Sequence, residues 1–412
     1  GLVGSEMCIR DRYWKQQQIL EDENRSRGFR VPDHNEKYLC LSHFNNKHLI
    51  KLLARHTRKG ICSYCGDQTD VIDLADFIEI VCSRLTEYLG PIENENLYLG
   101  SSFFDDDEEE IPGIVQRGIY AAPANVEYYE SEGDVMMDYD LCSDNDSLNQ
   151  DIEDCLYVDG WIRRDPAGWL MKDRMLFSWR AFSSLVKTKL RYTFFRSAEY
   201  YEDVDGNINN GNDIISDISS MVGIIKQAIP IGTALYRGRP EDDKAPYSEF
   251  KDLTAPPREY AKNNRMNPKG ISMFYGSFDK DTPIEEIYNY TDKSRKIYLG
   301  QFLTSKELIV INLCNIPKPD FWMGENGDWQ KYAFLVDFHS EISKPVNPAD
   351  EELDYIPTQV FSEYLRYIQK VDGRNYDGIV YKSSLTGKKN IVLFYDNKTS
   401  ADVLHLNSVD II

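Results

Sequence analysis

The sequence contains no run of 18 or more apolar residues, so no segment can cross a membrane as a helix. It also lacks the basic start, apolar centre and small-residue cleavage site of a secretory signal, and we expect a cytoplasmic protein. Lys and Arg are outnumbered by Asp and Glu, 47 against 68, giving a net charge of −21. Because phosphate backbones repel such a surface, nucleic-acid binding is not expected.

Two kinds of site are missing as well. No G-x-G-x-x-G stands before a helix, which excludes a Rossmann-type dinucleotide site. Histidine is scarce, and after residue 213 only His339 and His405 occur, neither of them close to a serine-rich segment. A Ser–His nucleophile is therefore poorly supported in the second half of the chain.

Eight cysteines are scattered over 412 residues, which indicates reduced thiols rather than a disulfide framework. Cys40 and His43 form a C-x2-H pair, and Cys62 and Cys65 form a C-x2-C pair followed by Gly66. Two such pairs can supply the four ligands of a tetrahedral ion, and with four protein ligands the predicted zinc is structural. Ordinary buried thiols with a surface histidine are the alternative interpretation. Two further histidines between the pairs are alternative ligands: His48 and His56.

The chain divides into a lead-in and two domains. Residues 1–12 look foreign to the rest of the chain, and 1–36 as a whole are interpreted as a foreign or flexible lead-in. Apolar residues at helical spacing predict a mainly α-helical domain over 37–201. Residues 202–213 are rich in Gly and Asn and predict a linker. Within the first domain, the acidic stretch 105–154 is interpreted as a solvated connector.

Residues 214–412 change to a mixed pattern, which predicts an α+β fold. Short runs typical of strands are TALYRGR, ISMFYGSF, RKIYLGQF, ELIVINL, YDGIVY and NIVLFY. Helix-like runs are IISDISSMVGIIKQAI, TPIEEIYNY and PTQVFSEYLRYIQ.

Polar residues at strand ends mark the candidate site. LYRGRP carries Arg237 and Arg239, whose planar guanidinium groups suit a pyrophosphate, although salt-bridged surface arginines are the ordinary alternative. RMNPKGISMFY places Tyr275 on a strand, either stacked on a ligand ring or packed in the core. The loop of YDGIVYKSSLTGKKN offers Ser383 and Ser384.

Local chemistry predicts different roles for the two adjacent glutamates in TPIEEI. Thr282 and Pro283 fit the N-cap and first helical position, and Glu285 would complete a capping box. Glu286 has no such local role and points away from the stripe of Ile284, Ile287 and Tyr288, toward solvent or a cleft.

Five segments of this half of the chain follow one another in the order found in a known family: LYRGR, RMNPKGISMFY, TPIEEI, YIPTQVFSEYLR and DGIVYKSS. On these segments, this half of the chain resembles the RES domain family. The first domain, with its Cys/His pairs and the segment LFSWRAFSSLVKTKLRYTFF, is similar to the HEPN-type domain that accompanies some RES domains. His43 stands where that family often has cysteine.

The resemblance implies an ADP-ribosyltransferase-like fold that cleaves the nicotinamide–ribose bond of NAD⁺, with NAD⁺ as substrate. Family members act as toxins neutralised by an antitoxin protein. The family arginine corresponds to Arg237, the glutamate to Glu286 and the serine to Ser383, with Ser384 beside it. Arg265 and Tyr275 correspond to the RMNP arginine and the strand tyrosine. Arg237, helped by Arg265, would hold the pyrophosphate.

Several interpretations of the reaction and of the first domain are compatible with the sequence. The enzyme could hydrolyse NAD⁺ or use phosphate, or it could transfer ADP-ribose to a macromolecule. A HEPN ribonuclease would need an R-x4-6-H motif, and the one candidate runs from Arg27 to His34 in the polar lead-in. The first domain could also sense a trigger or bind an antitoxin.

Overall fold

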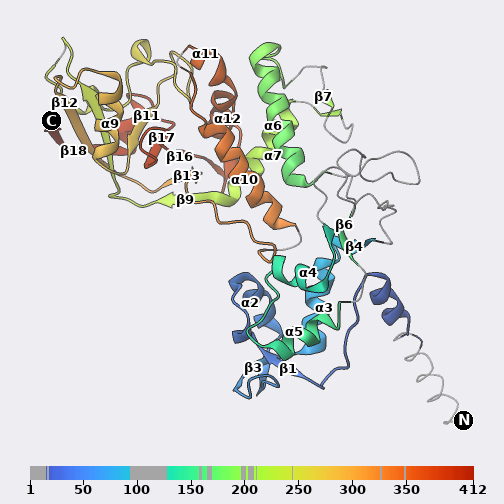
Figure 1. Ribbon diagram of the computed structural model, residues 1–412. Helices are drawn as coiled ribbons and strands as arrows, with labels where there is room; N and C mark the ends of the chain where they lie inside the picture. The colour runs from blue at the N-terminus through green and yellow to red at the C-terminus, as the bar shows by residue number, and fades with distance from the viewer. Residues whose placement is uncertain are drawn as a thin grey trace, which may run out of the picture. The chain divides into compact units, whose positions relative to one another are not determined.

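The chain forms two compact units that share its length unevenly (Figure 1). Unit 1 consists of Gly1–Trp169 and Asp320–Trp329, and unit 2 of Leu170–Pro319 and Gln330–Ile412. The computed structural model describes residues 15, 18–92, 128–156, 160–164, 169–195, 201–202, 208–209, 211–243, 245–324, 327–347 and 349–412. Residues 1–12, which the sequence marks as foreign, lie outside this set.

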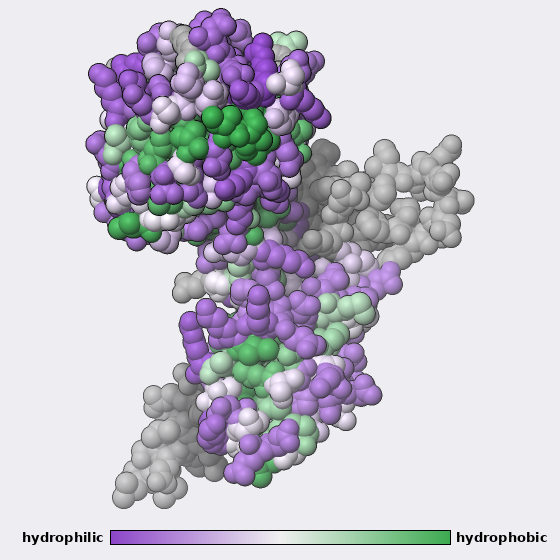
Figure 2. Space-filling view, turned by 90° about the vertical axis from the view of Figure 1, so that its left-hand side faces the viewer, coloured by the Kyte–Doolittle hydropathy of each residue, from purple (hydrophilic) through white to green (hydrophobic). Residues whose placement is uncertain are grey.

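Hydrophilic residues cover most of the face seen in Figure 2, as the abundance of charged residues predicts. Smaller apolar areas interrupt them. Over the described residues, every helix is too short or too polar to span a lipid bilayer.

Unit 1 combines short helices with two small sheets. The first sheet has the order β1-β3-β2 and the second β4-β6-β5, all strands pairing antiparallel. The strands are β1 (Tyr38–Cys40), β2 (Arg58–Ile61), β3 (Gln68–Asp73), β4 (Leu89–Pro91), β5 (Tyr128–Tyr129) and β6 (Trp161–Arg163). The helices are α2 (Lys47–Leu53), α3 (Leu74–Leu85), α4 (Glu132–Asp138) and α5 (Asp146–Glu153), with short 3-10 turns at Leu41–His43 and Ala54–His56.

The core of unit 1 forms around α3, where the predicted helical spacing is confirmed. Phe77, Ile78 and Val81 are buried on one face of this helix, and Asp73 caps its start by accepting from the backbone N–H of Ala75 at 3.0 Å. The hairpin of β2 and β3 is not predicted from the sequence, because its strands are short and mostly polar.

Part of the acidic stretch is folded rather than a connector. Residues 128–154 form β5, α4 and α5, and Val135, Met136, Leu148 and Ile152 are buried in the core of unit 1. The interpretation of this part as a solvated connector is therefore wrong. A high density of carboxylates hides a helical pattern in which only every third or fourth residue is apolar. Residues 105–127 lie outside the described set.

The segment Asp320–Trp329 belongs to unit 1 although its neighbours in sequence belong to unit 2. Trp322 is 2% exposed, and its indole Nε1 donates to the carbonyl of Tyr139 at 2.6 Å. Arg84, on α3, donates to the carbonyls of Phe321, Met323 and Gly324 at 2.9, 3.0 and 3.0 Å. A buried guanidinium thus satisfies three carbonyl groups of this segment.

Unit 2 is built around one eight-stranded sheet of order β18-β12-β10-β11-β17-β16-β13-β9. All its pairs are antiparallel except β13 with β16. The strands are β9 (Lys226–Ile229), β10 (Ala234–Pro240), β11 (Phe274–Ser277), β12 (Ile297–Thr304), β13 (Leu308–Asn312), β16 (Gly378–Lys382), β17 (Lys389–Leu393) and β18 (Leu404–Ile411). Small two-stranded pairings add β7 (Tyr201–Glu202) with β8 (Ile208–Asn209) and β14 (Lys370–Val371) with β15 (Arg374–Asn375).

Helices cover the sheet, and their apolar side chains form its main core. Figure 1 shows α6, α7, α10 and α12 gathered together beside the strands. The helices are α6 (Met171–Thr188), α7 (Gly211–Val222), α8 (Phe250–Leu253), α9 (Asp281–Tyr290), α10 (Asp328–Ser343), α11 (Glu351–Asp354) and α12 (Ile356–Tyr367), with 3-10 turns at Gly223–Ile225, Arg258–Tyr260 and Thr399–Asp402.

The first boundary between the compact units lies between Trp169 and Leu170, before the predicted linker at 202–213. Helix α6 lies within the predicted first domain, 37–201, yet its apolar face packs with unit 2. The rings of Trp179 and Phe338 meet edge to face at 5.0 Å between centroids. The apolar face of a helix shows that it is buried, but not which domain buries it.

Candidate functional site

Helix α9 carries Glu286 over the middle of the large sheet. Gly238 of β10 makes this approach possible, because a Cβ at that position would lie 2.6 Å from Cδ1 of Ile287. Glu285 is exposed, whereas Glu286 is half-buried and lines a cavity. The predicted difference between the two glutamates is thus present in the fold.

The start of α9 differs from the predicted capping box. The helix begins at Asp281, and the carboxylate of Asp279 accepts from the backbone N–H groups of Asp281 and Thr282 at 3.1 and 3.0 Å. The Thr282 hydroxyl is turned inward and donates to the same carboxylate at 2.9 Å. The capping box of Thr282 and Glu285 was therefore wrong, because an aspartate three residues earlier takes that role.

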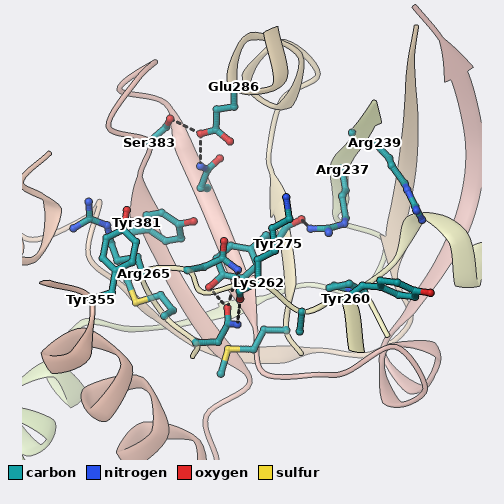
Figure 3. A pocket seen from close by; sticks show the side chains of 18 of the residues that line it. Arg237, Arg239, Tyr260, Lys262, Arg265, Tyr275, Glu286, Tyr355, Tyr381 and Ser383 are labelled. Atoms are coloured by element: carbon teal, nitrogen blue, oxygen red, sulfur yellow. Dashed lines mark hydrogen bonds between the residues drawn. The ribbon is translucent and has the colours of Figure 1, made fainter. Parts of the chain in front are cut away.

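Two donors hold the carboxylate of Glu286 in place (Figure 3). The Ser383 hydroxyl donates to Oε1 at 2.5 Å, and the Asn390 side-chain amide donates to the same oxygen at 2.8 Å. Ser383 lies in the loop after β16 and is 4% exposed, whereas Ser384 is exposed. Among the described residues Oε2 accepts no hydrogen bond, so one oxygen is anchored and the other stays free to face a ligand.

Arg237 lies on β10 opposite Gly300 and donates from Nη1 to the carbonyl of Tyr275 at 2.8 Å. Burial lowers the pKa of its guanidinium to about 10, so the group is still cationic at neutral pH. In the described part of the chain no carboxylate forms an ion pair with it. A cation that is desolvated without a carboxylate partner favours an anionic ligand.

Arg237 and Glu286 line the same cavity, which has a volume of about 630 Å³. A second cavity of about 420 Å³ adjoins it. The two share part of their walls, and the shared lining residues are Arg237, Gly238, Pro240, Tyr275, Glu286, Tyr381, Ser384 and Asn390. The predicted arginine, glutamate and serines thus meet in one place, at the junction of two cavities.

Tyr275 and the RMNP loop form the floor of the larger cavity. The Tyr275 hydroxyl donates to Oδ1 of Asn267 at 2.6 Å, and burial raises the pKa of this phenol well above its ordinary value. The Asn267 amide nitrogen donates to the carbonyls of Lys262 and Ile271 at 3.1 and 2.7 Å. Asn267, which is 1% exposed, therefore sets the shape of the loop.

The other predicted arginines make contacts of their own. Arg265 donates to the carbonyls of Ile342 and Lys344 at the end of α10, so its donors are directed at the protein as well as lining the cavity. Arg239 donates to the carbonyl of Asp252 at 2.9 Å and stacks 3.8 Å above the Tyr247 ring. Arg239 also forms an ion pair with Asp242 at 3.5 Å, whereas Arg237 pairs with no carboxylate among the described residues.

The sequence analysis did not single out Asn390 and Tyr381. Asn390 is the second residue of β17 and is 7% exposed, and Tyr381 lies opposite it on β16. Burial raises the pKa of the Tyr381 phenol, so it stays protonated. The sequence marks Asn390 only as a polar residue directly before the apolar run IVLF.

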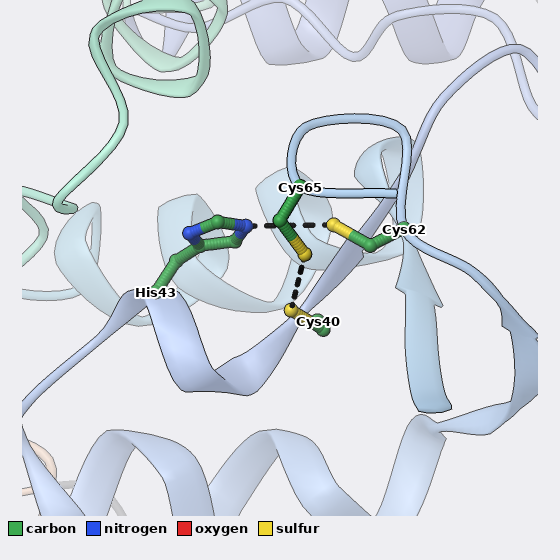
Figure 4. A group of neighbouring side chains, drawn as sticks. All are labelled: Cys40, His43, Cys62 and Cys65. Carbon is green, nitrogen blue, oxygen red and sulfur yellow. Dashed lines mark hydrogen bonds between the residues drawn. The ribbon is translucent and has the colours of Figure 1, made fainter. Parts of the chain in front are cut away.

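A second cluster lies in unit 1, where Cys40, His43, Cys62 and Cys65 converge (Figure 4). Their candidate ligand atoms all lie within 4.8 Å of one another. Cys40 Sγ is 3.7 Å from Cys65 Sγ, and Cys62 Sγ is 3.4 Å from His43 Nε2. Tetrahedral zinc with ordinary bond lengths predicts edges of ~3.8 Å between two sulfurs and ~3.5 Å between sulfur and nitrogen.

The peptide chain around the cluster favours the thiolate of Cys62. Burial alone raises the pKa of Cys62, but backbone hydrogen bonds from Cys65 and Tyr64 help to lower it to about 6. Gly66 closes the turn with a φ of +79°, and its N–H donates to the carbonyl of Cys62 at 3.0 Å. The predicted competitors His48 and His56 are not members of the cluster.

Comparison with known families matches both halves of the chain. Residues 55–200 match the family model described as HEPN/RES N-terminal domain 1, and residues 234–409 match the RES domain. No curated protein and no solved structure shows a significant match. Cys40 and His43 precede the first matched region, so half of the cluster lies outside it. The chain belongs to the proteins that join a HEPN/RES N-terminal domain to a RES domain.

Proposed function

We propose that unit 2 cleaves the bond between nicotinamide and ribose in NAD⁺, as a glycohydrolase or a phosphorylase. The observation that carries the proposal is the shared cavity of Arg237 and Glu286, in which the cation lacks a carboxylate partner and the carboxylate has one free oxygen. The RES-domain match supports an enzyme that acts on NAD⁺. Here NAD⁺ is the substrate, not a recycled cofactor.

The charges of the two cavities suggest how the dinucleotide lies. In addition to Arg237 and Glu286, the larger cavity is lined by the cations Arg239, Lys262, Arg265 and Lys382 and by the carboxylates Asp242 and Asp252. This excess of positive charge suits the anionic pyrophosphate, with the adenosine beside it. The smaller one adds only neutral side chains, among them Tyr236 and Leu385, and suits the nicotinamide amide. This orientation places the scissile bond at the junction, beside Glu286.

The reaction needs little proton transfer at its first step. The nicotinamide ring is already cationic, so it leaves as a neutral molecule when the C–N bond breaks, and positive charge develops on the ribose. The free oxygen of Glu286 stabilises this charge, while Ser383 and Asn390 keep the carboxylate oriented. Water, or phosphate in a phosphorylase, then attacks the anomeric carbon.

Transfer of ADP-ribose to a macromolecule is the first alternative, because the same cavity would serve it. A HEPN ribonuclease is not favoured by the contacts of its candidate residues. The Arg27 guanidinium donates to the Thr86 hydroxyl at 2.5 Å, and Nδ1 of His34 lies 3.7 Å from a carboxylate oxygen of Asp76. Both residues have structural partners, and neither lines either of the two cavities.

For unit 1 we propose a structural zinc ion held by Cys40, His43, Cys62 and Cys65. Two distances, Cys40 Sγ to Cys65 Sγ and Cys62 Sγ to His43 Nε2, are close to the edges of a tetrahedral zinc site, and four protein ligands leave no position for a reacting water. Such an ion would fix the hairpin of β2 and β3 against β1. The apolar cluster at this place is small: Cys40, Cys62 and Val71, with Tyr38 and Tyr64 packed against them.

We further propose that the chain acts in the cytoplasm as a toxin controlled by an antitoxin protein. Loss of NAD⁺ would arrest the cell, so an enzyme of this kind needs an inhibitor. The antitoxin is inferred from the family and from no contact within the chain. Co-expression with neighbouring genes, scored by growth and cellular NAD⁺, tests it: a neighbour that restores both supports the partner.

The central experiment incubates the purified full chain with NAD⁺, with and without phosphate, and separates the products. Free ADP-ribose indicates hydrolysis, a phosphorylated ADP-ribose indicates phosphorolysis, and ADP-ribosylated protein indicates transfer. Glu286→Gln should lower the rate by about 10³-fold, because the amide lacks the negative charge. Glu285→Gln, one residue earlier and exposed, is the matched control and should retain the rate. Full activity of Glu286→Gln would exclude the mechanism.

A further inference from the structure

The two ring nitrogens of His43 have different partners. Nε2 lies 3.4 Å from Cys62 Sγ, inside the cluster. Nδ1 lies 2.6 Å from Oδ1 of Asp144, outside it. A histidine that binds a metal through one nitrogen commonly donates a hydrogen bond from the other to a carboxylate, which fixes its tautomer and orientation.

We propose that Asp144 is a positioning residue of the metal site, which holds His43 with Nε2 directed at the ion. This inference rests on the zinc site proposed above. Asp144 is 101 residues from His43 in the sequence and contributes no ligand atom. It therefore extends the site to a third segment of the chain, between α4 and α5.

Backbone contacts support this assignment. The N–H of Asp144 donates to the carbonyl of His43 at 3.3 Å, so Asp144 contacts His43 through both main chain and side chain. Next to it, the Asn145 side chain donates to the carbonyl of Tyr64 at 3.4 Å. The same loop thus contacts both halves of the site, the C-x2-H pair and the C-x2-C turn.

The loop that presents Asp144 is itself held rigidly. The Asn149 side chain accepts from the backbone N–H of Ser143 at 2.7 Å and donates to the Ser143 carbonyl at 3.2 Å. The Asn145 side chain accepts from the N–H of Leu148 and caps α5. The backbone on both sides of Asp144 is therefore held by contacts that do not involve the four cluster residues.

Exposure makes Asp144 a clean position for substitution. Its side chain is 69% exposed, so Asp144→Ala removes the hydrogen bond without leaving a cavity in the core. The matched control is Asp146→Ala. Asp146 is exposed, lies two residues further along at the start of α5, and is not a member of the cluster.

The experiment measures affinity of the purified full chain for Zn²⁺ by competition with a chromophoric chelator, and the Co²⁺ form by absorption. Asp144→Ala should weaken Zn²⁺ binding by about 10- to 100-fold and alter the cobalt bands, because the imidazole is no longer oriented. Asp144→Asn should show a smaller loss, since its amide oxygen can still accept from Nδ1. Asp146→Ala should bind like the unsubstituted chain.

A double substitution separates positioning from a general structural role. In a His43→Cys background the ligand is a thiolate without a second nitrogen, so Asp144→Ala should cause no further loss of affinity. An equal loss in both backgrounds would overturn the inference. If the unsubstituted chain binds no Zn²⁺, the proposed metal site itself fails. If it binds Zn²⁺ and Asp144→Ala binds equally tightly, only the role of Asp144 fails.

Discussion

The two candidate sites are assembled in opposite ways. The cluster of unit 1 takes its four candidate ligands from 26 consecutive residues, Cys40 to Cys65, and the spacing alone predicts it. The pocket of unit 2 joins Arg237, Glu286 and Ser383, which are spread over some 150 residues. Short loops can bring ligands together locally, whereas the pocket requires the strand order of the whole sheet. Because the two sites are assembled differently, we expect substitutions in the cluster to lower stability and substitutions in the pocket to lower catalytic rates.

Removal of the metal should have the largest effect, and it should be one on stability. Treatment with a strong chelator, or Cys62→Ser, should abolish the cooperative thermal unfolding of unit 1, because structural zinc contributes about 10 kcal/mol or more in small domains. Differential scanning calorimetry measures it. Cys142→Ser, at an exposed thiol outside the cluster, is the control. If the thermal unfolding is unchanged after chelation, the cluster does not stabilise unit 1, and the expected contrast between a stabilising site and a catalytic site is lost.

Arg237→Ala should affect catalysis and spare stability. We expect kcat/KM for NAD⁺ to fall by about 10²-fold or more, since a half-buried guanidinium is lost from the anion site. Arg237→Lys should recover only part of it, because an ammonium group cannot form two parallel hydrogen bonds. Arg374→Ala, at an exposed strand position, serves as the control for steady-state kinetics. Equal rates in the alanine and control variants would contradict the assignment.

The two adjacent serines offer a finer test. Ser383→Ala should lower kcat by about 10-fold, because Glu286 loses a charge-assisted hydrogen bond of ~1.5–3 kcal/mol. Ser384→Ala should have little effect on kcat, since this side chain is exposed and lies at the rim. The reverse order in single-turnover measurements would show that Ser384 is the functional serine.

Asp279→Ala should have the smallest effect, and one that depends on pH. Burial opposes ionisation, but hydrogen bonds from Thr282 and the ion pair with Lys388 lower the pKa of Asp279. Its stabilisation of about 1 kcal/mol is therefore present above pH ~4 and is lost as the pH falls through the folded-state pKa. Denaturant unfolding at neutral and acidic pH measures this. A difference from the unsubstituted chain that is the same at neutral and acidic pH would contradict it.

The sequence predicted those parts that depend on local chemistry. The six predicted strands of unit 2 are present, and helix α9 presents Glu286 rather than Glu285 to the cavity. The end of the predicted helix at 214–229 was wrong, because Lys226–Ile229 pairs as a strand with β13. Its apolar residues are spaced so that helix and edge strand are both compatible.

Features that depend on distant contacts were not predictable. Asn390 and Tyr381 have ordinary strand sequences, and only the pairing of β16 with β17 places them beside Glu286. Helix α10 was missed because its apolar residues do not follow one narrow stripe. The role of Asp144 was hidden for the same reason, since its partner His43 is 101 residues away.

The segment Asp320–Trp329 makes the two units inseparable by a single cut. The chain passes between them at Trp169, at Pro319 and at Trp329, so cleavage at one junction leaves two covalent links. A fragment beginning at residue 211 would carry Trp322 without the Tyr139 carbonyl and without Arg84, and would expose an indole that is otherwise buried. A cut at the boundary in sequence therefore divides the buried contacts of unit 1 between two fragments.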